Sequence, residues 1–429
     1  MRTIISLILP LLFIFSTMAV AQDTELEVFG YYEPQLMSAH LQGNTYTMSS
    51  NKLRVDLQLR TSDRVMFGAN FDYITYHGKT NWDITEYLPE SIQNEIPSMQ
   101  FLGYEFNPYQ LEFKDESFLD NAFVKLTFPR FDLTIGKQQL SMGTGYAWNP
   151  TDVFNQKDLI DPTYEQPGHN AIRLDVPLGG RVNMTAIYAT GEEWKDSDML
   201  LKIKTNISRF DLSALVIQKN WIYSDPRAID PIRMDLYGLK TQRQIVGGDL
   251  VGELLGFGIW SEFAYNYVDI DDDSKKAYLE QLDFLQLSDQ INPIEIDENF
   301  YEFLAGMDYT FDFQTYILCE YYRNSAGAAD YKQYSFVDWM HYFLAERRSI
   351  ARDQIYGYIN HPLTDLIDVG GSVIMSLNDE SVAIVPMINY NIFENVDLSL
   401  WGNIYLGSEG KIYASEQGNG GMLRARVYF

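Results

Sequence analysis

Cysteine and histidine are scarce in this sequence. Its 429 residues include one cysteine, Cys319, which excludes an intramolecular disulfide and any metal or redox site built from paired cysteines. None of the five histidines falls in a metal-binding spacing such as H-E-x-x-H, and none belongs to a recognisable nucleophile motif. We therefore expect no catalytic residue, no metal and no cofactor. The histidines are His40, His77, His169, His341 and His361.

Long apolar runs are missing after residue 21. No later stretch reaches the roughly 18 apolar residues that a helix needs to cross a bilayer. A membrane protein without such a stretch crosses as strands, because only helices and closed barrels pair every backbone polar group in lipid. Hydrophobic residues make up 46% of the chain and aromatic residues 14%, as in strands that face lipid on one side and water on the other. A long soluble β-protein has a similar composition.

Basic residues are outnumbered almost two to one. The chain holds 32 Lys and Arg against 59 Asp and Glu, a formal net charge of -27. This balance argues strongly against nucleic acid as a partner. The acidic excess lies in segments such as 269–273 and 295–298, where it indicates a solvated surface, with divalent-cation bridging as the lesser alternative.

The first residues have the pattern of a secretory signal. Arg2 is followed by an apolar run and then by Ala19-Val20-Ala21, which matches an A-x-A cleavage site. The apolar run is shorter than the roughly 18 residues of a membrane-spanning helix, which disfavours an anchor helix. We predict a signal peptide over 1–21 and a single domain over 22–429.

Alternation of apolar and polar residues with period two is the main signal in that domain. Between Lys52 and Arg60, leucines and valine occupy one face and charged residues or glutamine the other. The segment ending at Phe429 alternates in the same way. Such segments number about 18, with 16 to 18 plausible: 25–37, 51–60, 64–76, 118–128, 131–140, 170–178, 181–190, 198–207, 210–221, 242–254, 258–268, 298–311, 313–324, 350–361, 365–378, 381–391, 396–407 and 421–429.

The connections between these strands alternate between short and long. Short ones include 61–63, 129–130, 179–180 and 394–395, and long ones include 77–117, 141–169, 222–241, 269–297 and 325–349. Outer-membrane barrels have short periplasmic turns and long extracellular loops, so we predict an all-β, antiparallel transmembrane β-barrel. An even number of strands lets the last strand pair with the first and removes the open edge. Few residues precede the first strand, so we expect no plug domain.

Two local features qualify this pattern. Pro386 falls inside a predicted strand, where it cannot donate a ladder hydrogen bond, so we expect that strand to bulge or to be misplaced. The segment 331–350 places Val337, Met340 and Leu344 at helical spacing, which predicts a short helix within a long loop.

Two stretches carry a family resemblance. One runs from Gly136-Lys137-Gln138-Gln139 through Gly143 and Gly145 to Trp148-Asn149-Pro150-Thr151-Asp152-Val153-Phe154. It resembles a motif of Gram-negative outer-membrane porins, including relatives of alginate-export porins. The last residues, Arg424 to Phe429, are similar to the signal that such barrels present to the barrel-assembly machinery. The resemblance implies a porin or substrate channel of about 18 strands.

The first stretch has two interpretations from its residues alone. The candidate loop residues are Gly143, Gly145, Asn149, Pro150 and Asp152, which together predict a glycine-rich turn whose aspartate accepts from nearby backbone amides. The loop either folds into the lumen as a constriction or stays outside the barrel as an ordered extracellular loop. The residues favour the extracellular loop.

Basic residues alternate with apolar ones on several strands and are candidates to line the pore. If closure brings Arg54, Arg60, Arg424 and Arg426 together, they form one basic patch that favours anions. Alternatively, the lumen charges pair with acidic neighbours such as Asp56 and Asp175. The full set of pore-lining candidates is Lys52, Arg54, Arg60, Lys125, Arg173, Lys202, Lys204, Arg424 and Arg426.

Aromatic residues suit two girdles at the membrane interfaces. The sequence holds 30 tyrosines, 25 phenylalanines and 7 tryptophans. Those near predicted strand ends are Tyr31, Tyr32, Tyr73, Tyr76, Trp221, Tyr265, Tyr267, Tyr321 and Tyr322. An aromatic path that stacks sugar rings inside the pore is the alternative for some of them.

These observations favour an outer-membrane channel through which small hydrophilic solutes diffuse, including anions or oligosaccharides. The expected partners are outer-membrane lipid and lipopolysaccharide, the barrel-assembly machinery and the solutes themselves. A barrel with a structural or adhesive role through its acidic loops is the alternative. An outer-membrane hydrolase ranks third, because it needs a serine, a histidine and an orienting polar group brought together on the wall.

Overall fold

The structure is a computed structural model. It describes residues 24–41, 43–97, 100–101, 104–105, 107–159, 165–191, 194–230, 233, 235–288, 291–296 and 298–429. The predicted signal peptide, 1–21, lies outside the described residues.

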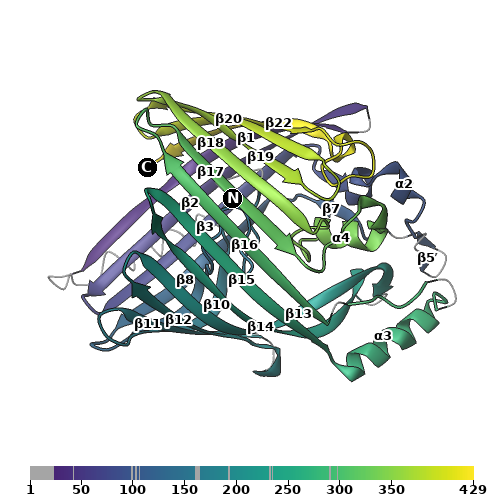
Figure 1. Ribbon diagram of the computed structural model, residues 1–429, viewed down its shortest axis with the longest axis horizontal. Coiled ribbons are helices and arrows are strands. Elements are labelled where there is room, and N and C mark those ends of the chain that lie inside the picture. The colour runs from purple at the N-terminus through teal and green to yellow at the C-terminus, as the bar shows by residue number, and fades with distance from the viewer. Residues whose placement is uncertain are drawn as a thin grey trace, which may run out of the picture.

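In the described part of the chain, 18 strands form one antiparallel sheet that closes on itself (Figure 1). Each barrel strand pairs with the barrel strands that precede and follow it in the chain. Each of the 18 predicted segments corresponds to one strand. The strands are β1 Glu25–Leu41, β2 Asn44–Ser62, β3 Val65–Gly78, β8 Glu116–Thr127, β9 Asp132–Gln139, β10 Gly168–Pro177, β11 Val182–Ala189, β12 Asp198–Ile207, β13 Phe210–Asp230, β14 Asp235–Leu254, β15 Phe257–Ile270, β16 Asn299–Thr310, β17 Tyr316–Asn324, β18 Asp353–Thr364, β19 Ile367–Ser376, β20 Val382–Phe393, β21 Val396–Tyr405 and β22 Asn419–Tyr428.

Strands β22 and β1 close the barrel, as the even strand count predicts. Tyr428 lies opposite Tyr31, and Arg424 lies opposite Gln35. Beyond the last strand, the amide of Phe429 donates to the carbonyl oxygen of Gly30 at 3.0 Å, and Gly30 donates back at 3.1 Å. Closure pairs the two edges that would otherwise leave backbone groups unpaired in lipid.

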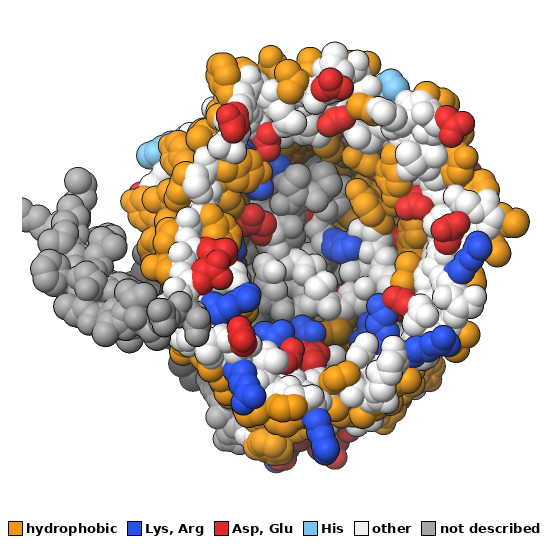
Figure 2. Space-filling view, turned by 90° about the vertical axis from the view of Figure 1, so that its left-hand side faces the viewer, with side chains coloured by type: hydrophobic (Ala, Val, Ile, Leu, Met, Phe, Trp, Pro, Cys, Tyr) orange, Lys and Arg blue, Asp and Glu red, His pale blue; other side chains and the backbone are white. Residues whose placement is uncertain are grey.

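Apolar side chains cover the outer face of the barrel, and charged ones line its inner wall. On β22, Leu423 and Val427 are 42% and 39% exposed, whereas the intervening Arg424 is 6% exposed. Figure 2 shows this arrangement from one open end, with hydrophobic side chains around the outside and Lys, Arg, Asp and Glu around the hollow. No helix among the described residues is long and apolar enough to cross a membrane. The chain is thus an all-β barrel of the transmembrane type.

The two ends of the barrel differ in their connections. Tight turns such as 208–209, 255–256 and 394–395 gather at the end we call the turn end, on the left of Figure 1. The other end, the loop end, carries the helices and the short additional strands that are found among the described residues. These elements are β4 Asn81–Asp83, η1 Ile84–Tyr87, α2 Glu90–Gln93, β5 Gln100–Phe101, β6 Tyr104–Glu105, β7 Gln110–Glu112, η2 Trp194–Asp196, α3 Asp272–Phe284, η3 Tyr331–Gln333, α4 Phe336–Phe343 and η4 Ser415–Gln417.

The predicted helix within 331–350 is confirmed by η3 and α4. Ser335 begins α4 through a reciprocal cap, in which its side chain accepts from the amide of Asp338 and the Asp338 side chain accepts from the amide of Ser335. Trp339 and Met340, which belong to this helix, are fully buried.

Two local predictions are wrong. The segment 222–241 is not a long loop, because β13 continues to Asp230 and β14 begins at Asp235. Pro386 neither bulges nor displaces its strand: it pairs in register with Gly371 of β19, and the irregularity in β20 falls between Asn391 and Phe393 instead. The backbone pairing with β21 resumes in the same register at Met387, so the missing donor of Pro386 costs only local pairing.

Candidate pore constriction

The connection between β9 and β10, residues 140–167, enters the barrel, and we call it the inward loop. Its residues 140–159 and 165–167 are described. Glu320 on β17 accepts three consecutive backbone amides from it: Tyr146 at 2.7 Å, Ala147 at 3.0 Å and Trp148 at 3.0 Å. The indole nitrogen of Trp260 donates to the same carboxylate at 2.6 Å. Because Glu320 is fully buried, its charge is held entirely by N–H donors.

Glu262 on β15 holds the inward loop at a second point of the same wall. Its carboxylate accepts the amide of Thr144 at 2.9 Å and both the amide and the hydroxyl of Thr151, at 2.5 and 2.7 Å. Glu262 is 1% exposed. We call these contacts of Glu262 and Glu320 the carboxylate anchor.

The glycines of the motif let the chain pass this close to the wall. Gly143 has φ +79°, a conformation that other residues rarely adopt, and a Cβ there would lie 2.5 Å from the carboxylate of Glu262. A Cβ on Gly145 would lie 1.8 Å from the carbonyl oxygen of Trp148. Both positions therefore require glycine for steric reasons.

Asp152 organises the loop from within, as its residue type predicted. It accepts the amides of Met142 at 3.2 Å and of Phe154 and Asn155 at 3.1 Å each. The turn Asn149-Pro150-Thr151-Asp152 is closed by a hydrogen bond from the Asp152 amide to the Asn149 carbonyl oxygen at 3.1 Å. Burial raises the pKa of Asp152, and these donors offset part of that effect.

The inward loop therefore lies in the barrel, so the favoured interpretation as an extracellular loop is wrong. Strands β15 and β17 lie five and seven places around the ring from β10, where the loop ends. The ring of Trp148 stacks on Tyr322 of β17 with centroids 4.9 Å apart. The loop thus reaches across the lumen to the far wall before it returns.

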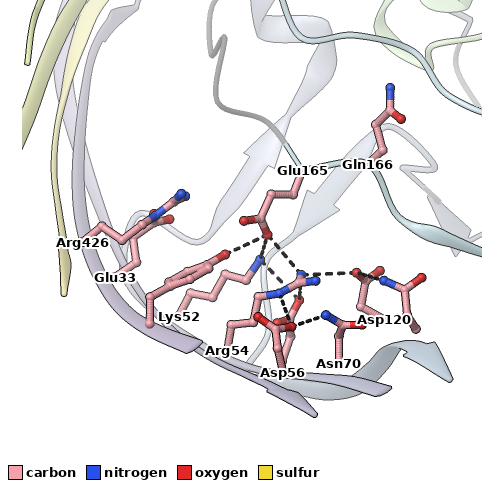
Figure 3. A network of polar contacts seen from close by, with 12 residues as sticks. Glu33, Lys52, Arg54, Asp56, Asn70, Asp120, Glu165, Gln166 and Arg426 are labelled. Carbon is pink, nitrogen blue, oxygen red and sulfur yellow. Dashed lines mark hydrogen bonds and ion pairs between the residues drawn. The ribbon is translucent and has the colours of Figure 1, made fainter. Parts of the chain in front are cut away.

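On its return the inward loop contacts the opposite wall through Glu165 (Figure 3). The Glu165 carboxylate lies 3.0 Å from the Lys52 ammonium and 3.1 Å from the Arg54 guanidinium, and it accepts the hydroxyl of Tyr31 at 2.7 Å. Burial alone would raise the pKa of Glu165, but Lys52, Tyr31 and Arg54 together lower it. We call these contacts the ion-pair anchor.

The ion-pair anchor belongs to a larger set of charges on β1, β2, β3, β8 and β22. Arg54 contacts Asp56 at 2.9 Å and Asp120 at 3.2 Å, and Lys52 contacts Asp72 at 3.3 Å. On β22, Arg426 lies 2.5 Å and Arg424 3.7 Å from Glu33 of β1. Four basic and five acidic side chains thus meet along this wall: Lys52, Arg54, Arg424 and Arg426 with Glu33, Asp56, Asp72, Asp120 and Glu165.

The predicted basic patch is therefore wrong. Arg54 lies in the acidic surroundings of the ion-pair anchor, Arg424 and Arg426 share Glu33, and Arg60 is exposed near the turn end. The other candidates each have an acidic partner, as the alternative interpretation expects. Their pairs are Lys125 with Asp132, Arg173 with Asp175, Lys202 with Asp249 and Lys204 with Asp211, at 2.8 to 2.9 Å.

The aromatic girdle prediction separates into two groups. Tyr32 and Tyr73 are more than a third exposed on the outer face, at 44% and 40%. Tyr31, Trp221 and Tyr322 face inward instead: Tyr31 bonds Glu165, Tyr322 stacks on the inward loop, and Trp221 lines a cavity. Strand ends alone do not distinguish these groups, because inner and outer faces alternate there too.

Sequence reasoning missed Glu165, Glu262 and Glu320. Glu262 and Glu320 carry a usable signal, since each alternates with outward apolar residues and so lies on the inner face. The partners of all three are distant in sequence, by 111 or more residues. Residue type alone could not show that backbone amides, rather than basic side chains, neutralise two of them.

The described residues contain no group of three or more His, Cys, Asp or Glu arranged to hold a metal ion. Two histidines face backbone or threonine groups: His341 lies 2.7 Å from the carbonyl oxygen of Ser224, and His361 lies 2.9 Å from the Thr315 hydroxyl. The expectation that the protein is not an enzyme stays a prediction.

The fold defines a class: the closed 18-stranded β-barrel, here with a loop held across its lumen. No protein-family model matches the chain, and no curated protein matches its sequence. Among solved structures, OccAB4 of Acinetobacter baumannii has a TM-score of 0.53 at 11% identity, covering 94% of this chain and 97% of that one. OccAB2 of the same organism has a TM-score of 0.53 at 8% identity, covering 95% and 98%.

A mutant of the Rh. blastica porin has a TM-score of 0.44 at 12% identity, covering 94% of this chain and all of that one. The likenesses to OccAB4 and OccAB2 show a shared fold. The narrower resemblance to alginate-export porins stays a prediction.

Proposed function

We propose that the protein is an outer-membrane channel for small hydrophilic solutes, narrowed by the inward loop. The observation that carries this proposal is the double attachment of the loop, through Glu262 and Glu320 on one wall and Glu165 on the other. A loop fixed across a lumen reduces the free cross-section and fixes the path that remains.

The charged inner wall supports passage of water and polar solutes. An apolar wall would dewet, whereas rings or clusters of charged side chains keep a pore hydrated and set its selectivity. Five acidic groups against four basic ones near the ion-pair anchor favour weak cation preference over anion preference.

The outer membrane is the proposed location. The outer face carries large apolar residues such as Leu423 and Val427, the barrel leaves no open edge, and the A-x-A pattern ending at Ala21 fits export. The final strand, which ends beside Phe429, is the segment we expect the barrel-assembly machinery to bind. Lipopolysaccharide is the expected partner of the outer rim.

Single-channel recording of the refolded protein in a planar bilayer tests the proposal. The expected result is discrete, steady conductance steps in salt solution, with a reversal potential in a salt gradient that indicates weak cation preference. Protein that inserts, as shown by protease protection of vesicle-bound barrels, but never conducts at any voltage would contradict the channel and favour the structural or adhesive role.

A further inference from the structure

Two cavities adjoin the inward loop. The smaller has a volume of about 290 Å³ and lies against β13, β14 and β16. The larger has a volume of about 650 Å³ and lies against β19 and β21. Residues of the inward loop and of the loop before β18 line both cavities. The shared lining residues are Phe154, Asn155, Gln156, Ala345 and Arg348.

The lining of the larger cavity combines ring faces with planar polar groups. Its volume falls in the range of about 300–1,000 Å³ that is typical of small-molecule sites. Tyr342, Phe343 and Tyr405 supply rings, and Gln156 and Gln417 supply amides. Aromatic rings present flat apolar faces, while amides donate and accept at their edges.

Charge decides between an ionic and a neutral ligand. Each basic side chain that lines the smaller cavity contacts a carboxylate: Lys219 with Asp198 at 2.5 Å, Arg243 with Glu302 at 3.3 Å, Arg347 with Asp338 at 2.9 Å and Arg348 with Glu302 at 3.0 Å. An incoming anion would therefore compete with carboxylates that are already in place. The cavity does not offer an excess positive charge to attract it.

Two basic residues, Lys157 and Arg348, line the larger cavity, and Arg348 is paired with Glu302. Lys157 donates to the carbonyl oxygen of Tyr146 at 3.0 Å and lies near the carboxylates of Glu320 and Glu262. Burial lowers the pKa of Lys157, and those two carboxylates oppose the effect. A carboxylate ligand would therefore have to compete with Glu302 for Arg348 and with a backbone carbonyl oxygen for Lys157.

We propose that the larger cavity binds a ring of a neutral saccharide as it passes through the pore. A sugar ring has an apolar C–H face and a rim of hydroxyl groups, which match the rings of Tyr342 and Tyr405 and the amides of Gln156 and Gln417. This inference rests on the proposed channel function and narrows its solute class.

The test uses maltotriose, a neutral saccharide, and glucuronate, an anionic sugar, on the full-length mature barrel. Maltotriose is expected to interrupt single-channel current in a concentration-dependent way and to bind detergent-solubilised protein in isothermal titration. Glucuronate is expected to bind at least about tenfold more weakly, because Arg348 is already paired with Glu302 and Lys157 already donates to a backbone carbonyl oxygen.

Matched variants localise the site. Replacing Tyr342 and Tyr405 together by leucine should weaken maltotriose binding about tenfold, since stacking surface is lost with little change in volume. Tyr331→Leu, in the same loop as Tyr342 but outside the lining of both cavities, should leave binding unchanged. Unaltered thermal unfolding of the double variant shows that the barrel itself is intact.

The outcomes separate the two proposals. Saccharide binding without conductance would overturn the channel and leave the saccharide site standing. Conductance with no maltotriose binding would overturn the site, as would equal binding by the double variant or tighter binding of glucuronate. If the double variant fails to fold, Gln156→Leu provides the same test on the polar side of the cavity.

Discussion

The two anchors of the inward loop hold it by different physical means. The carboxylate anchor consists of buried acids that accept backbone amides, with Glu262 and Glu320 at most 1% exposed. The ion-pair anchor joins side chains, and the Glu165 side chain is 30% exposed. Buried charge-assisted hydrogen bonds are short and rigid, whereas partly exposed ion pairs are screened by solvent and salt. We therefore expect the carboxylate anchor to hold the loop rigidly and the ion-pair anchor to respond to salt and pH.

Loss of the carboxylate anchor should have the largest effect. Glu320→Gln places amide hydrogens where four N–H groups need an acceptor, so buried donors are left unpaired. We expect the free energy of unfolding in detergent micelles to fall by about 3 kcal/mol. Glu253→Gln, on the exposed end of β14, is the control and should behave as the wild type. Equal stability of both variants would show that the carboxylate anchor does not stabilise the protein.

Neutralising basic side chains on the wall around the ion-pair anchor should alter the ion selectivity of the channel. Arg54→Gln with Arg424→Gln leaves two basic side chains against five acidic ones, compared with four against five in the wild type. The reversal potential in a salt gradient should shift toward stronger cation preference. A shift toward anions, or none, would show that ions do not pass along this wall.

Acidification should release the ion-pair anchor only at low pH. The pKa of Glu165 lies below its ordinary value of 4.5, because Lys52, Tyr31 and Arg54 outweigh the effect of burial. An acid with a lowered pKa gives its full stabilisation above the ordinary value and loses it as pH falls through the lowered one. Current fluctuations should therefore stay constant from pH 7 to 5 and grow below 4.5.

Glu165→Gln is the control for that measurement. It lacks the titrating carboxylate, so its current should fluctuate more than the wild type at every pH and show no Glu165-dependent rise. High salt should narrow the difference, since it screens the ion pairs that the variant lacks. A rise in wild-type fluctuations above pH 5 would assign the transition to another group.

The smallest effect is expected away from both anchors. Lys204 pairs with Asp211 at 2.8 Å, but the two side chains are 46% and 34% exposed near the turn end. Such pairs contribute roughly 0–1 kcal/mol. Lys204→Gln should change neither conductance nor thermal unfolding measurably. A measurable change in conductance would mean that the narrowest point lies near the turn end.

The barrel itself was largely predictable, because lipid imposes a strict period of two on every strand. The inner and outer faces of the alternating stretches around Arg54 and Arg424 follow from that rule. The alternation of short and long connections indicates the topology. The rule does not set where a strand stops beyond the membrane. Strands β13 and β14 therefore continue through 222–230 and 235–241, where the sequence suggested a loop.

The constriction was less predictable, because its contacts join residues far apart in the chain. Gly143 and Gly145 indicated a tight turn, but nothing local showed that the turn would approach Glu262. The predicted arginine patch failed for the same reason. Counting basic residues on a face omits the acids that neighbouring strands and the inward loop bring to them.

The most direct test of the constriction compares the wild type with a variant in which residues 143–158 are replaced by a short Gly-Ser linker. That change removes both the carboxylate anchor and the part of the loop that crosses the lumen. In planar bilayers under identical salt, the wild type should conduct in small, steady steps and the shortened variant in clearly larger ones. Steps of equal size would contradict the claim that the inward loop narrows the pore.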